Sequence, residues 1–516
     1  MLWIPLHDAR LTRGILLGVF AGGTLLTAAC SGSSQSPVPR ASAAPSAAPS
    51  GTPSTAPSAA PTPIDSNHVA FVVQISPGAI SAAPNVVPSA VNIYVTGQQP
   101  APSASSSCGS WLQVTDPSGT TAPFPTGGAT VTALPFYANG TGSGTTSQVI
   151  QLPELCSGRI YISVNGPLSI TSASGPAPWA SIGAAGFPAK FDMLEYSMPA
   201  NGLAAPSTDV DTSQENMIGL DLGLNLSGTQ YGSQTTGLKA GFMTQVEQVA
   251  SAYNSTWSGV IDSQWPTRLL SPLSVQYDFN NTGNTSLPGF NPGTFLDSAI
   301  QSAWDQYKTT CMSVVVSTAT GDYLAGKTVT GEVDANENFD FYYPAATQDC
   351  ATGLNSSNST LVAQIPSPFN QNYWIGNVGG GWSSATGSVF MENGPFLLPA
   401  SASSSAGAQT FTNPYATGSA DIGNTVATAL NRGVFDPSVN PAYAAQPYCP
   451  SVAQLYPSGS PAATQNLWAT AVWGAAKNPT YGYGEAYAIP YDDKCGYSTD
   501  IKDSGARVIT VTVNAD

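Results

Sequence analysis

The sequence predicts a mainly β protein that also contains a mixed α/β part, and three observations lead to this fold class. Only 9% of the 516 residues are charged, whereas about 25% is usual in soluble domains, and 42% are hydrophobic. The chain contains 51 Gly and 43 Pro, which favours a loop-rich β protein. β-rich runs come first along the chain, and helical spacing of apolar residues follows them. This pattern excludes a coiled coil, a highly charged disordered chain and a collagen-like repeat.

The net charge of −16 and the shortage of His restrict the chemistry that the chain can perform. Nucleic-acid binding needs clustered Lys and Arg, so we expect no nucleic-acid partner. Only His7 and His68 are present, which nearly removes Ser-His-Asp triads, Cys-His nucleophiles and His-rich zinc sites. We therefore expect no metal and no cofactor, and Asp and Glu carry the remaining chemistry.

Residues 1–29 have the pattern of a lipoprotein signal peptide: two Arg, an apolar run over 14–26, and small residues before Cys30. The apolar run is shorter than the about 20 residues that span a bilayer. The segment that ends in Cys30 resembles a bacterial lipobox, in which the Cys becomes the lipidated N-terminus. The alternative is an ordinary secretory signal. We expect an exported protein, anchored by lipid at the bacterial cell envelope or surface.

The next segment, 30–66, predicts a disordered linker. It consists almost wholly of Ser, Ala, Pro, Gly and Thr. Such a composition cannot bury enough apolar area to become ordered, and Pro keeps the chain extended at about 3 Å per residue. The linker is therefore expected to lift the folded part away from a membrane.

Short, β-rich runs separated by turn residues predict strands in the first part of the folded region. These runs are 69–75, 91–95, 111–115, 129–133, 158–164 and 191–198. Residues 217–226 alternate apolar with polar or small side chains, which is typical of one half-buried strand.

The pattern changes after residue 237. Helical spacing predicts helices over 238–253, over 296–307 with Thr294 as the cap, over 422–430 with Gly433 as the terminator, and over 467–476. Strands are predicted at 314–317, 328–333, 486–491 and 508–513. We therefore predict one β domain from 67–237 and 480–516, and a mixed α/β domain from 238–479, with the two facing each other across a cleft.

The folded region has six Cys after Cys30, and none forms a Cys-x-x-Cys motif. They are Cys108, Cys156, Cys311, Cys350, Cys449 and Cys495. An even number of Cys in an exported protein predicts three disulfides. The sequence lacks both the Cys spacing and the His that a metal site would need. The sequence leaves the connectivity open, and the simplest pairing joins sequence neighbours.

Acidic residues are sparse enough to inspect one by one, and one cluster stands out. Glu195 lies inside a β-like run, where a charge is out of place unless it faces a cleft. Asp209 and Asp211 share one face of an extended segment that follows it. Glycoside hydrolysis needs two such carboxylates on neighbouring strands. The alternative is a strand pair with solvated acids.

The aromatic residues favour a sugar substrate. The chain contains 10 Trp and 21 Tyr, and aromatic faces stack on the C–H surfaces of sugars. Trp179 lies in a Gly-, Ser- and Pro-rich stretch that is expected to be a loop, where it either contacts sugar or fills a core.

A series of short motifs, in order along the chain, resembles glycoside hydrolase family 64, the thaumatin-like β-1,3-glucanases. The motifs are 158–164, 191–195, 208–211, 265–272, 295–304, 330–333, 429–434 and 486–493. The resemblance covers most of 67–516. It implies a thaumatin-like β-sandwich or barrel domain and a mixed α/β domain, which together form a wide groove for β-1,3-glucan.

The resemblance also implies inverting, endo-type hydrolysis that releases short oligosaccharides. By position, Glu195 would be the general acid and Asp211 the general base. Thr212 stands where the family often has an aromatic residue, which keeps Asp209 open as the base. Substrate contacts are expected from Asp209, Ser197, Thr208, Trp179, Tyr491, Asp492 and Asp493.

Two other functions remain possible at this stage: a surface lipoprotein that binds glucan without cutting it, and a structural envelope protein. The acids at 195 and at 209 or 211 favour the enzyme. We expect a monomer whose partners are β-1,3-glucan and, through the lipid, a membrane.

Overall fold

The structure is a computed structural model. It describes residues 63, 65, 67–76, 91–100, 108–136, 146–164, 166–171, 190–198, 207–215, 217–253, 269–271, 296–316, 323–343, 359–365, 416–431, 433, 466–477, 488, 499–505 and 508–514. Within them, no helix is both long and apolar enough to cross a membrane.

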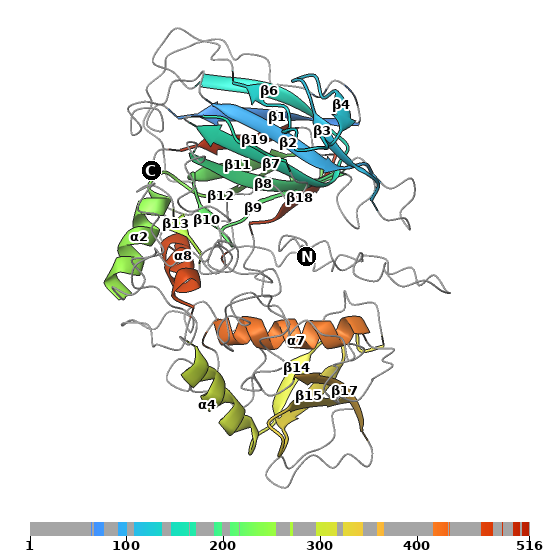
Figure 1. The fold of residues 1–516 in the computed structure, drawn as a ribbon, viewed down its shortest axis with the longest axis vertical. Helices are drawn as coiled ribbons and strands as arrows, with labels where there is room; N and C mark the ends of the chain where they lie inside the picture. The colour runs from blue at the N-terminus through green and yellow to red at the C-terminus, as the bar shows by residue number, and fades with distance from the viewer. Residues whose placement is uncertain are drawn as a thin grey trace.

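The first of two large sheets has five strands in the order β12-β11-β19-β1-β6 (Figure 1). These strands are β1 (His68–Ile75), β6 (Thr146–Pro153), β11 (Leu222–Ser227), β12 (Ser233–Gly237) and β19 (Val508–Val513). The C-terminal strand β19 runs parallel to β1 and antiparallel to β11. The C-terminal strand therefore lies in the middle of the same sheet that contains the first described strand, β1.

The second large sheet follows the order β18-β9-β8-β7-β2-β3-β4, with β5 paired to β2. Its strands are β2 (Asn92–Gln98), β3 (Trp111–Val114), β4 (Thr121–Pro123), β5 (Leu134–Pro135), β7 (Cys156–Val164), β8 (Lys190–Ser197), β9 (Ser207–Thr212) and β18 (Ile501–Ser504). Neighbouring strands are antiparallel throughout.

The two sheets pack face to face around one apolar core. Phe71 and Val511 from the first sheet and Ile160 and Leu194 from the second belong to this core, and all four are fully buried. Because side chains alternate between the faces of a strand, every second residue of the central strands β1, β7 and β19 enters the core. The described strands form open, stacked sheets, which confirms a mainly β fold and favours the sandwich over the closed barrel.

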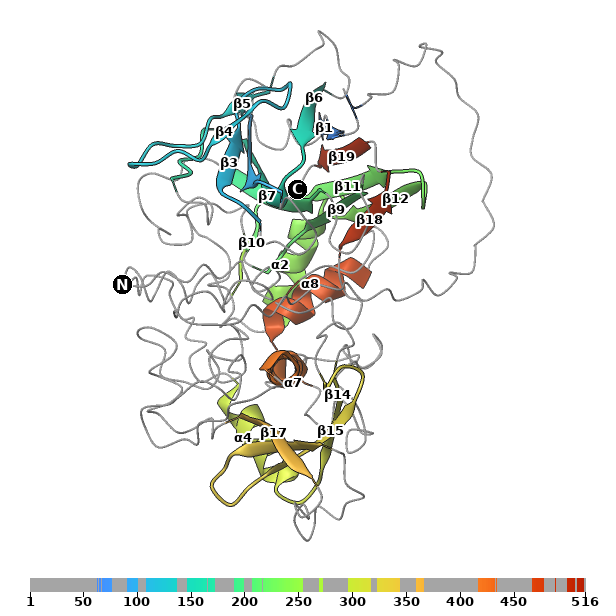
Figure 2. The same ribbon diagram turned by 90° about the vertical axis from the view of Figure 1, so that its right-hand side faces the viewer.

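Helices and smaller sheets form the rest of the described chain. They are β10 (Met217–Ile218) paired with β13 (Leu269–Leu270), the meander β14 (Met312–Val315), β15 (Thr328–Val333), β16 (Phe339–Tyr343) and β17 (Thr360–Ile365), and helices α2 (Phe242–Tyr253), α4 (Asp297–Tyr307), α7 (Ala416–Asn431) and α8 (Leu467–Lys477). Figure 1 and Figure 2 both place α2 and α8 between the sandwich and α7. A second core joins Ile300, Phe339, Val426 and Trp468.

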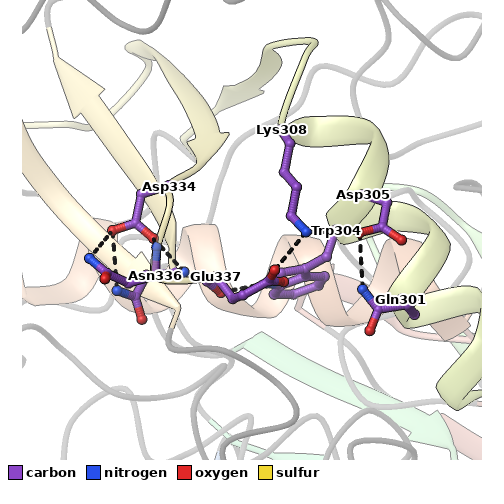
Figure 3. A network of polar contacts seen from close by, with 8 residues as sticks. Gln301, Trp304, Asp305, Lys308, Asp334, Asn336 and Glu337 are labelled. Atoms are coloured by element: carbon purple, nitrogen blue, oxygen red, sulfur yellow. Dashed lines mark hydrogen bonds and ion pairs between the residues drawn. The ribbon is translucent and has the colours of Figure 1, made fainter.

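The turn between β15 and β16 is fastened to helix α4 (Figure 3). Asp334 accepts the backbone N–H of Asn338 at 2.7 Å, which closes the turn. Glu337, at φ 66°, directs its carbonyl to the Trp304 Nε1–H at 3.0 Å and its carboxylate to Lys308 Nζ at 2.6 Å. These contacts fix the helix against the meander.

The structure differs from the sequence prediction at 217–226, where one strand was expected and two separate strands form. Gly219 donates its backbone N–H to the Asp192 carboxylate at 2.9 Å. A Cβ at Gly219 would lie 1.8 Å from the Phe191 carbonyl oxygen, so only glycine fits there. Two residues later, Asp221 turns toward helix α2. Tertiary hydrogen bonds thus interrupt the alternation that the sequence displays.

Other predicted elements have mixed outcomes. The strands at 328–333 and 508–513 and the helix over 467–476 are confirmed, and Gly433 (φ 64°) ends α7 with its N–H bonded to the Leu430 carbonyl. The strand at 129–133 is wrong, because Val131 bonds to the Ile170 carbonyl within a loop. Helix α4 has Leu296 at its N-cap without a side-chain cap, and Thr294 lies outside the described residues. The domain boundaries stay predictions. Of the predicted strand at 486–491 the structure describes Ala488 alone, and this residue is not in a strand.

One predicted disulfide is confirmed, and for the other two the structure describes at most one of the two Cys. Cys108 and Cys156 are bonded, with their Cα atoms 6.1 Å apart, and this bond ties the segment before β3 to the start of β7. Cys311 is also disulfide-bonded. The remaining Cys, namely Cys350, Cys449 and Cys495, lie outside the described residues, as do Cys30 and the linker.

Asp221 links the sandwich to helix α2, and its substitution is expected to weaken the fold. Its buried carboxylate accepts the N–H groups of Phe242 at 2.9 Å and Met243 at 3.0 Å, where the helix begins. In Asp221→Asn an amide NH₂ faces one of these donors, so the free energy of unfolding should fall by about 1–3 kcal/mol. Urea unfolding measures this loss, and the exposed Asp305→Asn serves as the control. An Asp221→Asn curve that superimposes on the wild type would contradict the prediction.

Candidate active site

Four neighbouring strands, β7, β8, β9 and β18, carry charged side chains on the face of the sheet that points away from the sandwich core. Leu194, Tyr196 and Val210 point into the core. Because side chains alternate, the residues between them project from the opposite face. This outer face carries Arg159, Glu195, Ser197, Asp209, Asp211 and Lys502.

The register places three of these charges in one row across the sheet. Glu195 lies directly opposite Arg159 on β7 and directly opposite Asp211 on β9. Arg159 Nε is 3.6 Å from Glu195 Oε1. The Arg159 side chain is 2% exposed and that of Glu195 16%, while Asp211 is buried. Directly opposed residues have Cβ atoms about 4.5–5.5 Å apart, so the two carboxylates are immediate neighbours.

Arg159 is itself held from two sides. Its guanidinium carbon lies 6.0 Å from the centroid of the Trp111 ring, within range of a cation–π contact. Tyr161 follows on the same face, and burial raises the pKa of this phenol while the Arg159 charge opposes the shift. A guanidinium fixed in this way orients the Glu195 carboxylate toward β7.

A second group of charges lies beside this row. Lys502 Nζ contacts Asp209 at 2.8 Å and Asp500 at 2.9 Å. Burial, and then the neighbouring Asp500 carboxylate, raise the pKa of Asp209 well above its usual range, against the effect of Lys502. Burial alone would lower the pKa of Lys502, but the two carboxylates outweigh it and raise this pKa. Asp209, Asp500 and Lys502 therefore form one group of interacting charges.

These positions bear on the choice between Asp209 and Asp211. Asp211 faces Glu195, whereas Asp209 faces Ser197 and is paired with Lys502. Of the two, Asp211 is the one that lies directly opposite Glu195. Its role as the base stays a prediction that the register supports.

Of the other residues that were predicted to contact the substrate, the structure places only some beside the Glu195–Asp211 row. Ser197 lies on the outer face next to Asp209. Thr208 is buried and shares the inward face of Val210, so the structure does not bring its side chain to the row. The remaining candidates, Trp179, Tyr491, Asp492 and Asp493, lie outside the described residues.

Three residues of the site were missed by the sequence analysis. Arg159 carried the same signal as Glu195, a charge inside a β-like run, and could have been found in that way. Lys502 and Asp500 gave no local signal, because only the pairing of β18 with β9 brings them to the site.

The row can perform acid–base chemistry with carboxylates alone. One carboxylic acid can give a proton to a leaving oxygen while the neighbouring carboxylate takes a proton from water. Among the described residues, no group of three or more His, Cys, Asp or Glu is arranged to hold a metal ion.

Comparisons with known proteins give the chain a family. The family model described as Beta-1,3-glucanase, glycoside hydrolase family 64, matches residues 80–513. No curated protein matches the chain significantly.

Two solved structures share the fold. A laminaripentaose-producing β-1,3-glucanase in complex with laminaritetraose has a TM-score of 0.58 and 17% identity, over 87% of this chain and 99% of that one. A β-1,3-glucanase domain from Clostridium beijerinckii has a TM-score of 0.53 and 16% identity, over 88% and 99%.

Proposed function

The chain belongs to glycoside hydrolase family 64, the β-1,3-glucanases, and from this premise we propose that it cuts β-1,3-glucan internally with inversion, using Glu195 and Asp211. Family membership makes it a glycoside hydrolase that acts on β-1,3-glucan. The release of short oligosaccharides, the stereochemistry and the residue roles are the proposed part.

A single observation carries the assignment: Glu195 and Asp211 are directly opposed on adjacent strands, on the outer face of the sheet. In the proposed reaction Glu195 donates its proton to the departing glycosidic oxygen. Asp211 removes a proton from the water that attacks the anomeric carbon from the other side of the sugar. Both steps need the carboxyl groups to stay in place while the sugar lies between them.

Arg159 supports inversion over retention. An inverting pair leaves room for a water molecule, with carboxyl groups about 6.5–9.5 Å apart, whereas a retaining pair is about 5 Å apart. The contact of Arg159 Nε with Glu195 Oε1 holds the Glu195 carboxylate on the β7 side. Since Asp211 lies on the β9 side, we expect the two carboxyl groups to lie far enough apart to admit a water molecule.

The substrate is expected to lie across the outer face of β7, β8 and β9. A wide groove formed with the mixed α/β part would hold a polymer there, and an open groove admits a chain at internal bonds. We retain a monomeric enzyme as part of the proposal.

Substitution of the two carboxylates tests the assignment. Glu195→Gln and Asp211→Asn should each lower the rate on a linear β-1,3-glucan by about 10²–10⁴, because each removes one proton-transfer group. Reducing-end release measures the rate, and pull-down with insoluble glucan should show that binding survives. Asp209→Asn is the matched control and should lose less, since Asp209 faces Ser197 and not Glu195. Near wild-type hydrolysis by Glu195→Gln would overturn the assignment, and a wild type that binds glucan without cutting it would favour a binding protein.

Product stereochemistry tests inversion separately. Hydrolysis of a β-linked glucan with inversion should first yield the α-anomer, because water attacks opposite the leaving group. Proton NMR, recorded before mutarotation equilibrates the product, distinguishes the two anomers. An initial β-anomer would identify Asp211 as a nucleophile and contradict the base role.

We also propose that Cys30 anchors the enzyme by lipid at the bacterial envelope, since it directly follows small residues at the end of the signal-like segment. Cys30→Ser should remain uncleaved or leave the membrane fraction, whereas Ser31→Ala should behave as the wild type. Membrane fractionation with incorporation of a labelled fatty acid measures both. Cys30→Ser that is processed and retained like the wild type would contradict a lipid anchor.

A further inference from the structure

The group around Lys502 is adjacent to the proposed base through the strand register. Ile501 pairs with Val210, and Lys502 pairs with Asp209. Two positions beyond the Ile501–Val210 pair, the Thr499 hydroxyl bonds to both the N–H and the carbonyl of Thr212, so the same register continues beyond the strand. The residue opposite Asp211 is therefore Asp500. Asp211 thus lies between Glu195 on one side and Asp500 on the other.

Three acids lie around Asp211, and each of them that is ionised opposes the ionisation of Asp211. On the strands packed beside it, the charged groups that face Asp211 are Glu195, with Arg159 behind it, Asp209, Asp500 and Lys502. Like charges at this spacing favour protonation, and a protonated Asp211 cannot accept a proton from water. Arg159 contacts Glu195, so its positive charge offsets the negative charge on the β8 side of Asp211. On the other side, the only described cation in contact with Asp209 and Asp500 is Lys502.

We propose that Lys502, together with Asp209 and Asp500, is a positioning and charge-balancing unit that keeps Asp211 ionised while glucan is cleaved. The inference rests on the proposed role of Asp211 as the base. The Lys502 ammonium contacts both acids and so offsets part of their negative charge beside Asp211. Lys502 acts through its neighbours and is a positioning residue, since nothing requires it to touch the substrate.

The pH profile of kcat/KM tests the unit. Lys502→Met removes a positive charge near Asp211, so a higher pH is needed to ionise the base. The acidic limb should move upward by about 0.5–1 pH unit, as expected for one charge at diagonal cross-strand distance in a partly solvated site. Lys502→Arg retains the charge and should restore the wild-type limb. A structural role alone would lower the rate at every pH and leave the limb in place.

The chain offers a matched control for the lysine. Lys308 also bridges two acids, with Nζ 2.9 Å from Asp305 and 2.6 Å from Glu337, but it lies on the meander side of the molecule (Figure 3). Lys308→Met should leave the acidic limb unchanged. An unmoved limb in Lys502→Met, no rescue by Lys502→Arg, or an equal shift in Lys308→Met would overturn the proposal. If Lys502→Met does not fold, Lys502→Gln takes its place with the same expected shift.

A measurement without substrate separates this proposal from the proposed function. In full-length protein labelled with ¹³C at the Asp carboxyl carbons, the Asp211 signal is identified by its loss in Asp211→Asn. Its titration midpoint should move upward in Lys502→Met and return in Lys502→Arg, whether or not the protein cleaves glucan. If the protein leaves glucan intact but the Asp211 midpoint shifts in Lys502→Met, the hydrolytic role is refuted and the charge-balancing role is supported. An unshifted midpoint would refute the unit.

Discussion

The sandwich depends on the return of the C-terminal segment to both of its sheets. β19 lies between β1 and β11, and its buried side chains Ile509 and Val511 are part of the core. β18 forms the edge of the other sheet, where Thr499 bonds to Thr212 across 287 positions of sequence. Neither sheet reaches its final order until this segment arrives. Such non-local pairing costs loop-closure entropy before it brings any stabilisation, so the closing of the sandwich is expected to be a late step in folding.

The same segment connects the fold to the chemistry. Without β18, the edge of the larger sheet would be β9, the strand that carries the proposed base, and its backbone groups would be unpaired. β18 covers this edge and brings Lys502 beside Asp209. The fixed strand spacing then sets the distances among the charges. A change that loosens the C-terminal segment would therefore affect stability and acid–base chemistry together.

Sequence analysis succeeded where a local pattern decides the structure. Alternation and helical spacing located most strands and helices. Glu195 stood out because a charge inside a strand needs an explanation, and Asp209 and Asp211 because they share one face of an extended segment. The break at Gly219 was missed, since it arises from the bond to the buried Asp192 carboxylate, which no local pattern encodes. Lys502 was missed for a related reason: its importance comes from pairing with a strand almost 300 residues away. Long-range register is set by packing of the whole sandwich.

The position of the row on a paired β-sheet also fits the demands of inversion. When Glu195 gives up a proton and Asp211 accepts one, the sum of the two charges stays the same. The flanking cations, Arg159 and Lys502, therefore face a constant total charge and need not move during the reaction. Charges that are already in place lower the barrier without a cost of reorganisation, and paired strands hold them more rigidly than loops can. Burial strengthens each of these interactions, and the contacts of Arg159 with Glu195 and of Lys502 with Asp209 and Asp500 offset part of the desolvation that burial imposes.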